Sequence, residues 1–303
     1  MGTRLRITPP DDYDFARDVC SYGYFLLAPN VWDPDLQTMT RPIELEDGIA
    51  RLTLSQPKGA GSAIAIQSDR MLSRPEQIEA KRQVTRMIRV DDEDIAEFHR
   101  VDPRWKKSGR GRISRSPTLW EDIVKTITSC NVTWAGTEGM NRRLCEQINT
   151  AFPSPNQIAR KRPATLRSRC GVGYRDARLI ELAKMFVRGE LEEAWFKDPS
   201  NDDETVFQRL LELPGVGPYA AGNILQLLGR YSRLAIDTES LRHGRCVLGF
   251  KGTDAKVTKQ LHAHYEPFGR HRFRSYWLEM WTLYEGKNGP AWTWRPRQTS
   301  FVM

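Results

Sequence analysis

The stretch Leu213-Pro214-Gly215-Val216-Gly217 joins two segments whose apolar residues have helical spacing. Apolar side chains recur at helical steps over residues 205–213 and do so again over residues 220–228. Pro218 falls at the first position of the second segment, where a missing N–H costs little, and Gly229 ends it. The pattern predicts two short helices joined by a turn of two glycines. Such a turn lets an anion reach the bare backbone at a helix N-terminus, although glycines needed only for their φ angles would give the same pattern.

Size and composition are those of a folded globular chain. The 303 residues are 39% hydrophobic and 28% charged, which fits one large domain or two ordinary ones and excludes a disordered chain. No apolar run approaches membrane-spanning length, and the start of the sequence lacks a signal-peptide core. We therefore expect no membrane association. The expected location is the cytoplasm (nucleoid) if the chain is bacterial, and the nucleus if it is eukaryotic.

The charge balance favours a polyanionic partner. The net charge is +8 and the pI is about 9.3. Over residues 100–115, seven Lys or Arg residues stand against one acid, Asp102. A solvated loop would explain such a run equally well in isolation. In a chain that also has a phosphate-binding turn, contact with a nucleic-acid backbone becomes the favoured interpretation.

The cysteines indicate neither a zinc site nor a disulfide framework. Their number is odd, and no two have the close spacing of a zinc ribbon. The five residues are Cys20, Cys130, Cys145, Cys170 and Cys246. We expect reduced, mostly buried thiols and no bound metal.

Residues 1–95 have the alternation and turn signals of β-strands. Apolar residues alternate on both sides of Asp47-Gly48, a strong signal for a two-residue hairpin. The predicted strands are 22–27, 43–54 (as a hairpin), 62–67 and 84–90. We expect them to form an antiparallel sheet.

The remainder of the chain is predicted to be helical. Apolar residues recur at i, i+3, i+4 and i+7 after Pro117, and similar stripes return repeatedly until residue 286. Residues 287–303 contain two prolines and look irregular. The sequence thus predicts a mainly α, α+β chain with a strand-rich part at 1–95, a helical domain at 96–286 and a tail at 287–303.

Two stretches carry a family resemblance. LPGVGPYAAGNILQLLGR, which contains the glycine turn, and LAIDTES, which follows it, resemble the helix-hairpin-helix (HhH-GPD) DNA glycosylase superfamily in pattern and spacing. Further stretches that resemble its alkylpurine and 8-oxoguanine branch lie at residues 109–148, 169–186 and 264–281. The resemblance extends over residues 20–285 and is strongest over 205–245.

This resemblance implies a fold and a set of cofactors. The branch begins with a small antiparallel sheet, which is followed by a helical glycosylase body with a DNA-binding cleft. Some members of the superfamily hold an iron–sulfur cluster on four closely spaced cysteines near the C-terminal end. Nothing after Cys246 could supply these, so we expect no cluster. A monovalent cation held by hairpin carbonyls, as in the family, is the ion that the resemblance implies.

Asp237 is the predicted catalytic residue. It stands twenty residues after Gly217, where an apolar approach ends and a helix begins. The resemblance implies that its carboxylate stabilises an oxocarbenium-like sugar while the base leaves. The alternative is that Asp237 only caps the helix that begins near Thr238, and both roles are compatible. Glu239 is a weaker substitute.

Position 219 decides the predicted reaction type. Family members with lyase activity have a lysine two residues after the last glycine of the hairpin, and its amine forms a Schiff base with the sugar. This chain has Tyr219, whose phenol has no amine and cannot form that adduct. We therefore expect a monofunctional enzyme. Tyr219 would instead line the base pocket.

The remaining predicted site residues fall into two groups, each with packing as the alternative. The expected pocket consists of Tyr219, Asn223, Tyr276 and Trp277. The expected DNA contacts are Asn131, Tyr174, Arg112, Gly215, Val216 and Gly217. The resemblance assigns Asn131 the position at which the 8-oxoguanine branch inserts an asparagine beside the orphaned partner base.

Together these features predict a monofunctional DNA glycosylase of base-excision repair. It would act as a monomer on double-stranded DNA that contains a damaged purine, everting the nucleotide and hydrolysing its N-glycosidic bond with Asp237. The missing lysine favours alkylated bases of the 3-methyladenine type, whereas Asn131 favours an 8-oxoguanine type. The alternative from another class is a non-catalytic DNA-damage-binding protein on the same scaffold.

Overall fold

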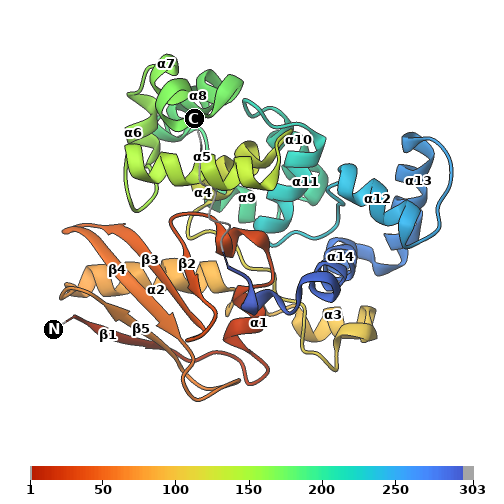
Figure 1. The fold of residues 1–303 in the computed structure, drawn as a ribbon, viewed down its shortest axis with the longest axis horizontal. Coiled ribbons are helices and arrows are strands. Elements are labelled where there is room, and N and C mark those ends of the chain that lie inside the picture. Colours follow the sequence, from red (N-terminus) through yellow and green to blue (C-terminus); the bar gives the residue numbers. More distant parts are fainter. Residues whose placement is uncertain (1, 296–303) are drawn as a thin grey trace. The chain divides into compact units, whose positions relative to one another are not determined.

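The computed structural model describes residues 2–295, which form two compact units (Figure 1). Of these residues, the first unit draws on 2–92, 112–191 and 288–295, and the second on 93–111 and 192–287. Each unit draws on separate segments of the chain, and the domain boundaries predicted at residues 95 and 286 stay predictions. Among the described residues, no helix has the length and apolar character needed to span a bilayer.

The first unit contains a five-stranded antiparallel sheet in the order β1-β5-β4-β3-β2. Its strands are β1 (Arg4–Ile7), β2 (Val31–Asp33), β3 (Thr38–Leu45), β4 (Gly48–Ser55) and β5 (Ile64–Ser68). A sheet followed by a largely helical body confirms the predicted mainly α, α+β class. Helix α2 (Arg74–Ile88) runs along the sheet and contacts β1 and β3 (Figure 1).

The β3–β4 hairpin lies where the sequence predicts it. Leu45 pairs with Gly48, so the two loop residues are Glu46 and Asp47, one position before the predicted pair. Gly48 opens β4 with φ +103°, a conformation that favours glycine. Along β4, Leu52 is buried and its neighbour Arg51 is exposed, as period-two alternation requires.

Two predicted strands are wrong. Residues 22–27 form a 3₁₀ helix, η1 (Gly23–Leu26), because a short apolar run buries equally well in either conformation. Residues 84–90 belong mostly to α2, whose N-cap residue Ser73 forms a capping box with Glu76. Three buried residues of that segment, Val84, Met87 and Ile88, share one helical face.

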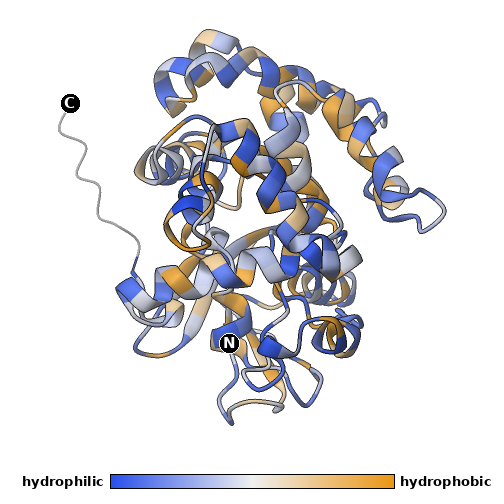
Figure 2. Ribbon diagram, turned by 90° about the vertical axis from the view of Figure 1, so that its right-hand side faces the viewer, coloured by the Kyte–Doolittle hydropathy of each residue, from blue (hydrophilic) through white to orange (hydrophobic). Residues whose placement is uncertain are grey.

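Helices complete the first unit. They are α1 (Phe15–Val19), α4 (Leu119–Ser129), α5 (Trp134–Gln147), α6 (Pro155–Ala159), α7 (Pro163–Thr165), the π-helical turn η3 (Leu166–Cys170), η4 (Gly173–Arg175), α8 (Asp176–Val187) and η6 (Ala291–Thr293). Of the predicted tail at 287–303, residues 296–303 lie outside the described part. Polar and apolar stretches alternate along the helices, as expected for elements that bury one side (Figure 2).

A buried ionic cluster joins the sheet to α4. Glu121 of α4 accepts hydrogen bonds from Arg41 of β3 at 2.6 Å and pairs with Lys125 at 2.7 Å. Arg41 also donates to the Asn30 side chain at 2.8 Å. Burial acts to raise the pKa of Glu121, but the two cations outweigh it and hold the pKa below its usual value. The carboxylate therefore stays ionised in the core.

The second unit is helical. It contains α3 (Ile95–Val101), η2 (Pro103–Trp105), α9 (Glu193–Lys197), α10 (Asp203–Leu211), α11 (Pro218–Leu227), α12 (Thr238–Cys246), α13 (Asp254–Tyr265), η5 (Glu266–His271) and α14 (Arg272–Asn288). The hairpin and Asp237 therefore belong to this unit, whereas Asn131, Tyr174 and Arg112 belong to the first.

Candidate active site

The glycine turn between α10 and α11 has the predicted form. The Val216 amide donates to the Leu213 carbonyl at 3.0 Å and closes the turn. Gly215 has φ +88°, where a side chain would be strained. The prediction of two helices joined by a turn that needs glycine is therefore confirmed.

The N-terminus of α11 follows directly on the glycine turn, with Gly217 as its N-cap residue. Pro218 has no N–H, and the amides that follow it lie in the first helical turn, whose N–H groups have no acceptor inside the helix. Gly217 is exposed, and a Cβ built on it would meet nothing within 4 Å. A phosphate oxygen has room to approach this backbone. Val216 needs a correction as a predicted DNA contact, because its side chain is buried and its amide is used inside the turn.

Gly222 brings the chain that precedes Asp237 against α11. A Cβ at this position would lie 3.0 Å from the Leu234 carbonyl oxygen and 3.3 Å from the Ala235 Cα. Only glycine permits so close an approach of backbone to helix. Sequence reasoning missed this residue, although a glycine inside an otherwise apolar helix was the available signal.

Asp237 caps α12 and keeps one oxygen available. Its Oδ1 accepts hydrogen bonds from the Ser240 amide at 2.9 Å and from the Ser240 hydroxyl at 2.8 Å. In return, the Asp237 amide donates to the Ser240 hydroxyl at 3.0 Å. Within residues 2–295, Oδ2 has no hydrogen-bond partner. The capping role and the proposed chemical role thus use different oxygens of one carboxylate.

Tyr276 of α14 contacts the Ser240 hydroxyl that holds the Asp237 carboxylate. Its hydroxyl oxygen lies 2.5 Å from the Ser240 hydroxyl and 3.2 Å from the Ala235 carbonyl oxygen. Because the Ser240 proton goes to Asp237, Tyr276 is the donor between the two hydroxyls. We call Ser240 and Tyr276 the carboxylate brace. Tyr276 is only 2% exposed, so the prediction that it lines an open pocket is corrected: it acts through Ser240.

Glu239 is committed to other partners. Its Oε2 accepts from the Arg242 side chain at 2.5 and 3.0 Å and from the Tyr284 hydroxyl at 3.1 Å. The Arg242 hydrogen bond is the main cause that lowers the pKa of Glu239. These contacts leave Asp237 as the carboxylate suited to face a substrate.

The other predicted pocket residues differ in accessibility. Tyr219 is half-buried in the first turn of α11, and Asn223 is buried one turn later. Trp277 is half-buried on α14 and stacks on Trp281, with ring centroids 5.4 Å apart, and on Phe273 at 6.3 Å. Tyr219 and Trp277 therefore keep part of their surface exposed, whereas the Asn223 side chain is buried, contrary to its predicted place in the pocket.

In the first unit, Asn131 and Tyr174 lie side by side. Asn131 is exposed, has φ +52° and lies between α4 and α5, and its side-chain amide is 3.5 Å from the Tyr174 hydroxyl. Tyr174 is 52% exposed. A non-glycine residue in the left-handed region is uncommon, and such strain is typical of functional positions. Both predicted DNA contacts thus occupy one exposed site.

Arg175 holds these two residues in place, and sequence reasoning missed it. Its guanidinium donates to the carbonyls of Ile127 (3.0 Å), Cys130 and Val172 (3.3 Å), and it lies 4.5 Å from the centre of the Tyr174 ring. It therefore satisfies the free carbonyls at the end of α4. The chain distance between α4 and residue 175 hid this contact from the sequence.

Arg112 is wrong as a predicted DNA contact. Its side chain is 2% exposed, forms two hydrogen bonds to the Asp12 carboxylate at 2.9 and 3.0 Å, and approaches Asp18 at 3.8 Å. An arginine committed in this way stabilises the first unit instead of binding a phosphate.

Much of the basic run at 100–115 is likewise neutralised. Arg104 pairs with Asp102 at 2.8 Å, and Arg110 pairs with Glu285 at 2.6 Å. These pairs lower the positive potential that the sequence predicts for the run.

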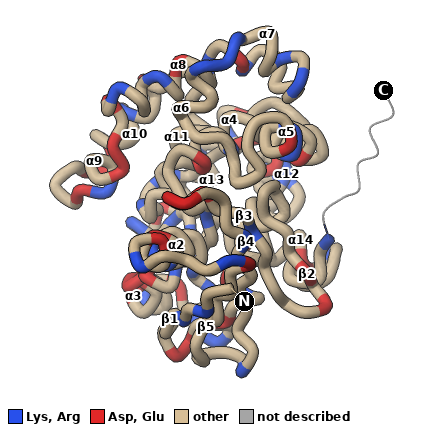
Figure 3. The backbone as a smooth tube through the Cα atoms, turned by 90° about the vertical axis from the view of Figure 1, so that its left-hand side faces the viewer, with Lys and Arg blue, Asp and Glu red and all other residues tan. Residues whose placement is uncertain are grey.

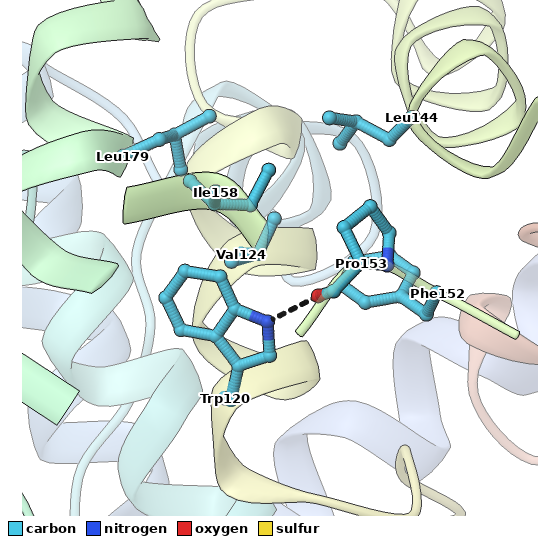
Figure 4. Close-up of a pocket in the computed structure, with 7 residues that line it drawn as sticks. All are labelled: Trp120, Val124, Leu144, Phe152, Pro153, Ile158 and Leu179. Carbon is cyan, nitrogen blue, oxygen red and sulfur yellow. Dashed lines mark hydrogen bonds between the residues drawn. The ribbon is translucent and has the colours of Figure 1, made fainter. Parts of the chain in front are cut away.

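A small apolar pocket in the first unit does not suit a nucleobase. Its empty volume is about 190 Å³, and it is lined by Trp120, Val124, Leu144, Phe152, Pro153, Ile158 and Leu179 (Figure 4). The Trp120 indole donates to the Pro153 carbonyl at 2.7 Å, so this lining offers no free polar group to orient a base. It is a packing gap of the core.

The cysteines are all free thiols, and Cys246 is exposed. In the part of the chain that the structure describes, no three His, Cys, Asp or Glu side chains gather as metal ligands would. The expected absence of an iron–sulfur cluster and the monovalent cation at the hairpin both stay predictions from the sequence.

Comparison with known proteins identifies structures that share this fold. The sequence matches no protein-family model and no curated protein. A 3-methyladenine DNA glycosylase from Archaeoglobus fulgidus superposes with TM-score 0.69 at 18% identity, over 91% of this chain and 98% of that one. MBOgg1 in complex with a low-affinity DNA ligand superposes with TM-score 0.63 at 17% identity, over 92% of this chain and 97% of that one. The chain has the fold of these helix-hairpin-helix DNA glycosylases.

A third structure agrees. It is the Clostridium acetobutylicum 8-oxoguanine glycosylase/lyase in complex with double-stranded DNA that contains cytosine opposite 8-oxoguanine. The two structures superpose with TM-score 0.59 at 18% identity, over 88% of this chain and 93% of that one. The resemblance read from the hairpin and Asp237 is thereby confirmed for the helix-hairpin-helix glycosylase fold.

Proposed function

We propose that this chain is a monofunctional DNA glycosylase that removes a damaged purine, with alkylated purines as the favoured class. The observation that carries the proposal is the geometry of Asp237. One carboxylate oxygen is held by two donors of Ser240, and the other has no partner within residues 2–295. A carboxylate that is fixed through one oxygen can direct the other oxygen at a positive charge that develops in a transition state.

Binding would begin at the glycine turn. The first-turn amides of α11 and the exposed backbone of Gly217 suit a phosphate of double-stranded DNA. The enzyme must evert the target nucleotide, because a base inside the duplex is out of reach. Asn131 and Tyr174 form an exposed pair in the first unit, and we propose that they contact the DNA.

The chemical step is a hydrolysis. The bond between C1′ and the purine nitrogen breaks, and its electron pair leaves with the base, while a water oxygen bonds to C1′ and gives its proton to the Asp237 carboxylate, which passes it to solvent. The sugar passes through an oxocarbenium-like state, which the Asp237 carboxylate would stabilise while it orients the water. A cationic alkylated purine leaves as a neutral base, so its departure needs no added proton.

Tyr219 argues against lyase activity. A Schiff base requires an amine at the sugar, and a phenol supplies none. Borohydride should therefore trap no covalent adduct between the protein and a damaged duplex. A trapped adduct would mean that a lysine elsewhere acts as the nucleophile.

The choice of alkylated purines rests on Tyr219, which stands where lyase-type family members have a lysine and whose half-buried aromatic ring would attract a cationic base more than a neutral one. An 8-oxoguanine type is the second candidate, because Asn131 in its left-handed conformation beside Tyr174 suits contact with a partner base. A protein that binds damage without catalysis is the third.

A panel of duplexes separates these candidates. Each duplex carries one lesion, 3-methyladenine-type, 8-oxoguanine or none, and the free base is quantified while the abasic sites are cleaved with alkali. We expect release of the alkylated base with matching alkali-labile sites. Release of 8-oxoguanine alone favours the second candidate, and binding without any release favours the third.

A further inference from the structure

A cluster of cations in the first unit has few acidic partners. It comprises Arg142 and Arg143 of α5, Arg160, Lys161 and Arg162 between α6 and α7, and Arg167 and Arg169 of η3. We call it the basic ridge. Figure 3 shows Lys and Arg gathered around α6, α7 and α8.

Contacts between the elements make the ridge one surface. The Arg143 side chain donates to the Cys170 carbonyl at 2.9 Å, so α5 lies against the end of η3. Gly171 has φ +67°, and a Cβ there would lie 2.5 Å from the Arg143 guanidinium. Burial raises the pKa of the Cys170 thiol, and the charges of Arg143, Lys161 and Arg169 oppose the shift. Positive charges from three segments therefore lie close to the Cys170 thiol.

Most of this charge is not neutralised. Glu146 approaches Arg142 at 3.9 Å, and Asp176 pairs with Arg167 at 2.8 Å. Four further cations make no ion pair with any residue between 2 and 295: Arg160, Lys161, Arg162 and Arg169. The basic run at 100–115 differs, because several of its arginines are paired.

The ridge continues into the exposed loop that carries Tyr174. Residues 171–173 connect η3 to it, and the Arg178 guanidinium lies 5.3 Å from the centre of the Tyr174 ring. A row of uncompensated cations beside an exposed aromatic side chain is the pattern of a nucleic-acid contact surface.

We infer that the basic ridge binds backbone phosphates of duplex DNA that flanks the damaged base. This inference rests on the proposed function, because it assumes that Tyr174 faces the lesion. It assigns an electrostatic DNA contact to the first unit. Contacts of this kind position the duplex without reading its sequence.

The salt dependence of binding to an undamaged duplex tests the inference. Equilibrium affinity of the full chain for a fluorescent 30-base-pair duplex is measured from 50 to 300 mM KCl. The test variant is Arg160→Gln/Arg162→Gln/Arg169→Gln. The control is Arg82→Gln/Lys184→Gln/Arg188→Gln, which removes the same charge from the same unit but at cations paired with Glu79, Glu181 and Glu190.

Removal of one cation that neutralises a phosphate should reduce the slope of log affinity against log salt by about 0.9. The slope of the test variant should therefore fall by about 2–3, and that of the control should change little. Equal slopes for the wild type and the test variant would overturn the inference, as would equal reductions in both variants. An acidic protein as the true partner would appear as the first of these outcomes. Binding of undamaged DNA does not require base release, so a failure of the ridge and a failure of the proposed glycosylase activity give different results.

Discussion

Removing the hydroxyl of Ser240 tests whether the carboxylate brace positions Asp237. Ser240→Ala leaves the backbone amide that caps α12 through Oδ1 but deletes the hydroxyl donor 2.8 Å from the same oxygen. It also removes the acceptor of the Asp237 amide and of the Tyr276 hydroxyl. The carboxylate can then rotate, and its second oxygen is no longer directed.

The magnitude follows from the hydrogen bonds that the substitution removes. A hydrogen bond to a charged group contributes about 1.5–3 kcal/mol. If the fixed geometry is needed in the transition state, the single-turnover rate should fall roughly 10- to 150-fold at about 1.4 kcal/mol per factor of ten. Loss of half of the capping box should lower the free energy of unfolding by about 0.5–2 kcal/mol.

The assay separates positioning from simple destabilisation. Single-turnover base release at saturating enzyme is measured together with duplex affinity, and only the rate should fall, because the hairpin is unaltered. Tyr276→Phe is the matched control: it also removes a buried hydroxyl but keeps both bonds from Ser240 to Asp237, so its rate should fall less. A Ser240→Ala rate within twofold of the wild type, or an equal loss in Tyr276→Phe, would refute the reasoning.

Two further predictions concern the first unit. Arg112→Gln should lower the free energy of unfolding by about 1.5–3 kcal/mol, because the bidentate pair with Asp12 is removed. Its affinity for duplex DNA should stay within twofold of the wild type. Denaturant titration measures the first quantity and duplex binding the second, and a large loss of affinity would contradict the structure. The hydrogen bond from Arg70 is the main cause that lowers the pKa of Glu76 to about 2, so this carboxylate stabilises the fold above its unfolded pKa of about 4.5. The stability gap between wild type and Glu76→Gln should therefore narrow as the pH falls from about 4.5 towards 2, and a gap independent of pH would exclude this role.

Local signals made the hairpin predictable. Glycine, proline and apolar spacing fix the turn around Gly215, and the same logic placed Asp237 at the start of a helix. The β3–β4 hairpin followed from alternation around Asp47 and Gly48. In each case the deciding residues lie within a few positions of the element that they define.

The errors arose where distant residues decide the outcome. Residues 84–90 alternate like a strand, but the capping box at Ser73 starts the helix that contains them. The burial of Arg112 depends on Asp12, one hundred positions earlier. The bond between Ser240 and Tyr276 joins residues 36 positions apart. No periodicity in the sequence encodes such pairings.

The most direct test of the proposed mechanism is the rate of base release by Asp237→Asn. Asparagine is as good an N-cap as aspartate, so the bond from the Ser240 amide should survive and the free energy of unfolding should change by less than about 0.5 kcal/mol. Only the negative charge is removed. At about 4 Å from a developing cation, that charge contributes about 4 kcal/mol at an effective dielectric constant of 20. We predict a single-turnover rate on an alkylated duplex roughly 10³-fold lower, with duplex affinity retained. A folded Asp237→Asn protein that releases the base within tenfold of the wild-type rate would contradict this mechanism.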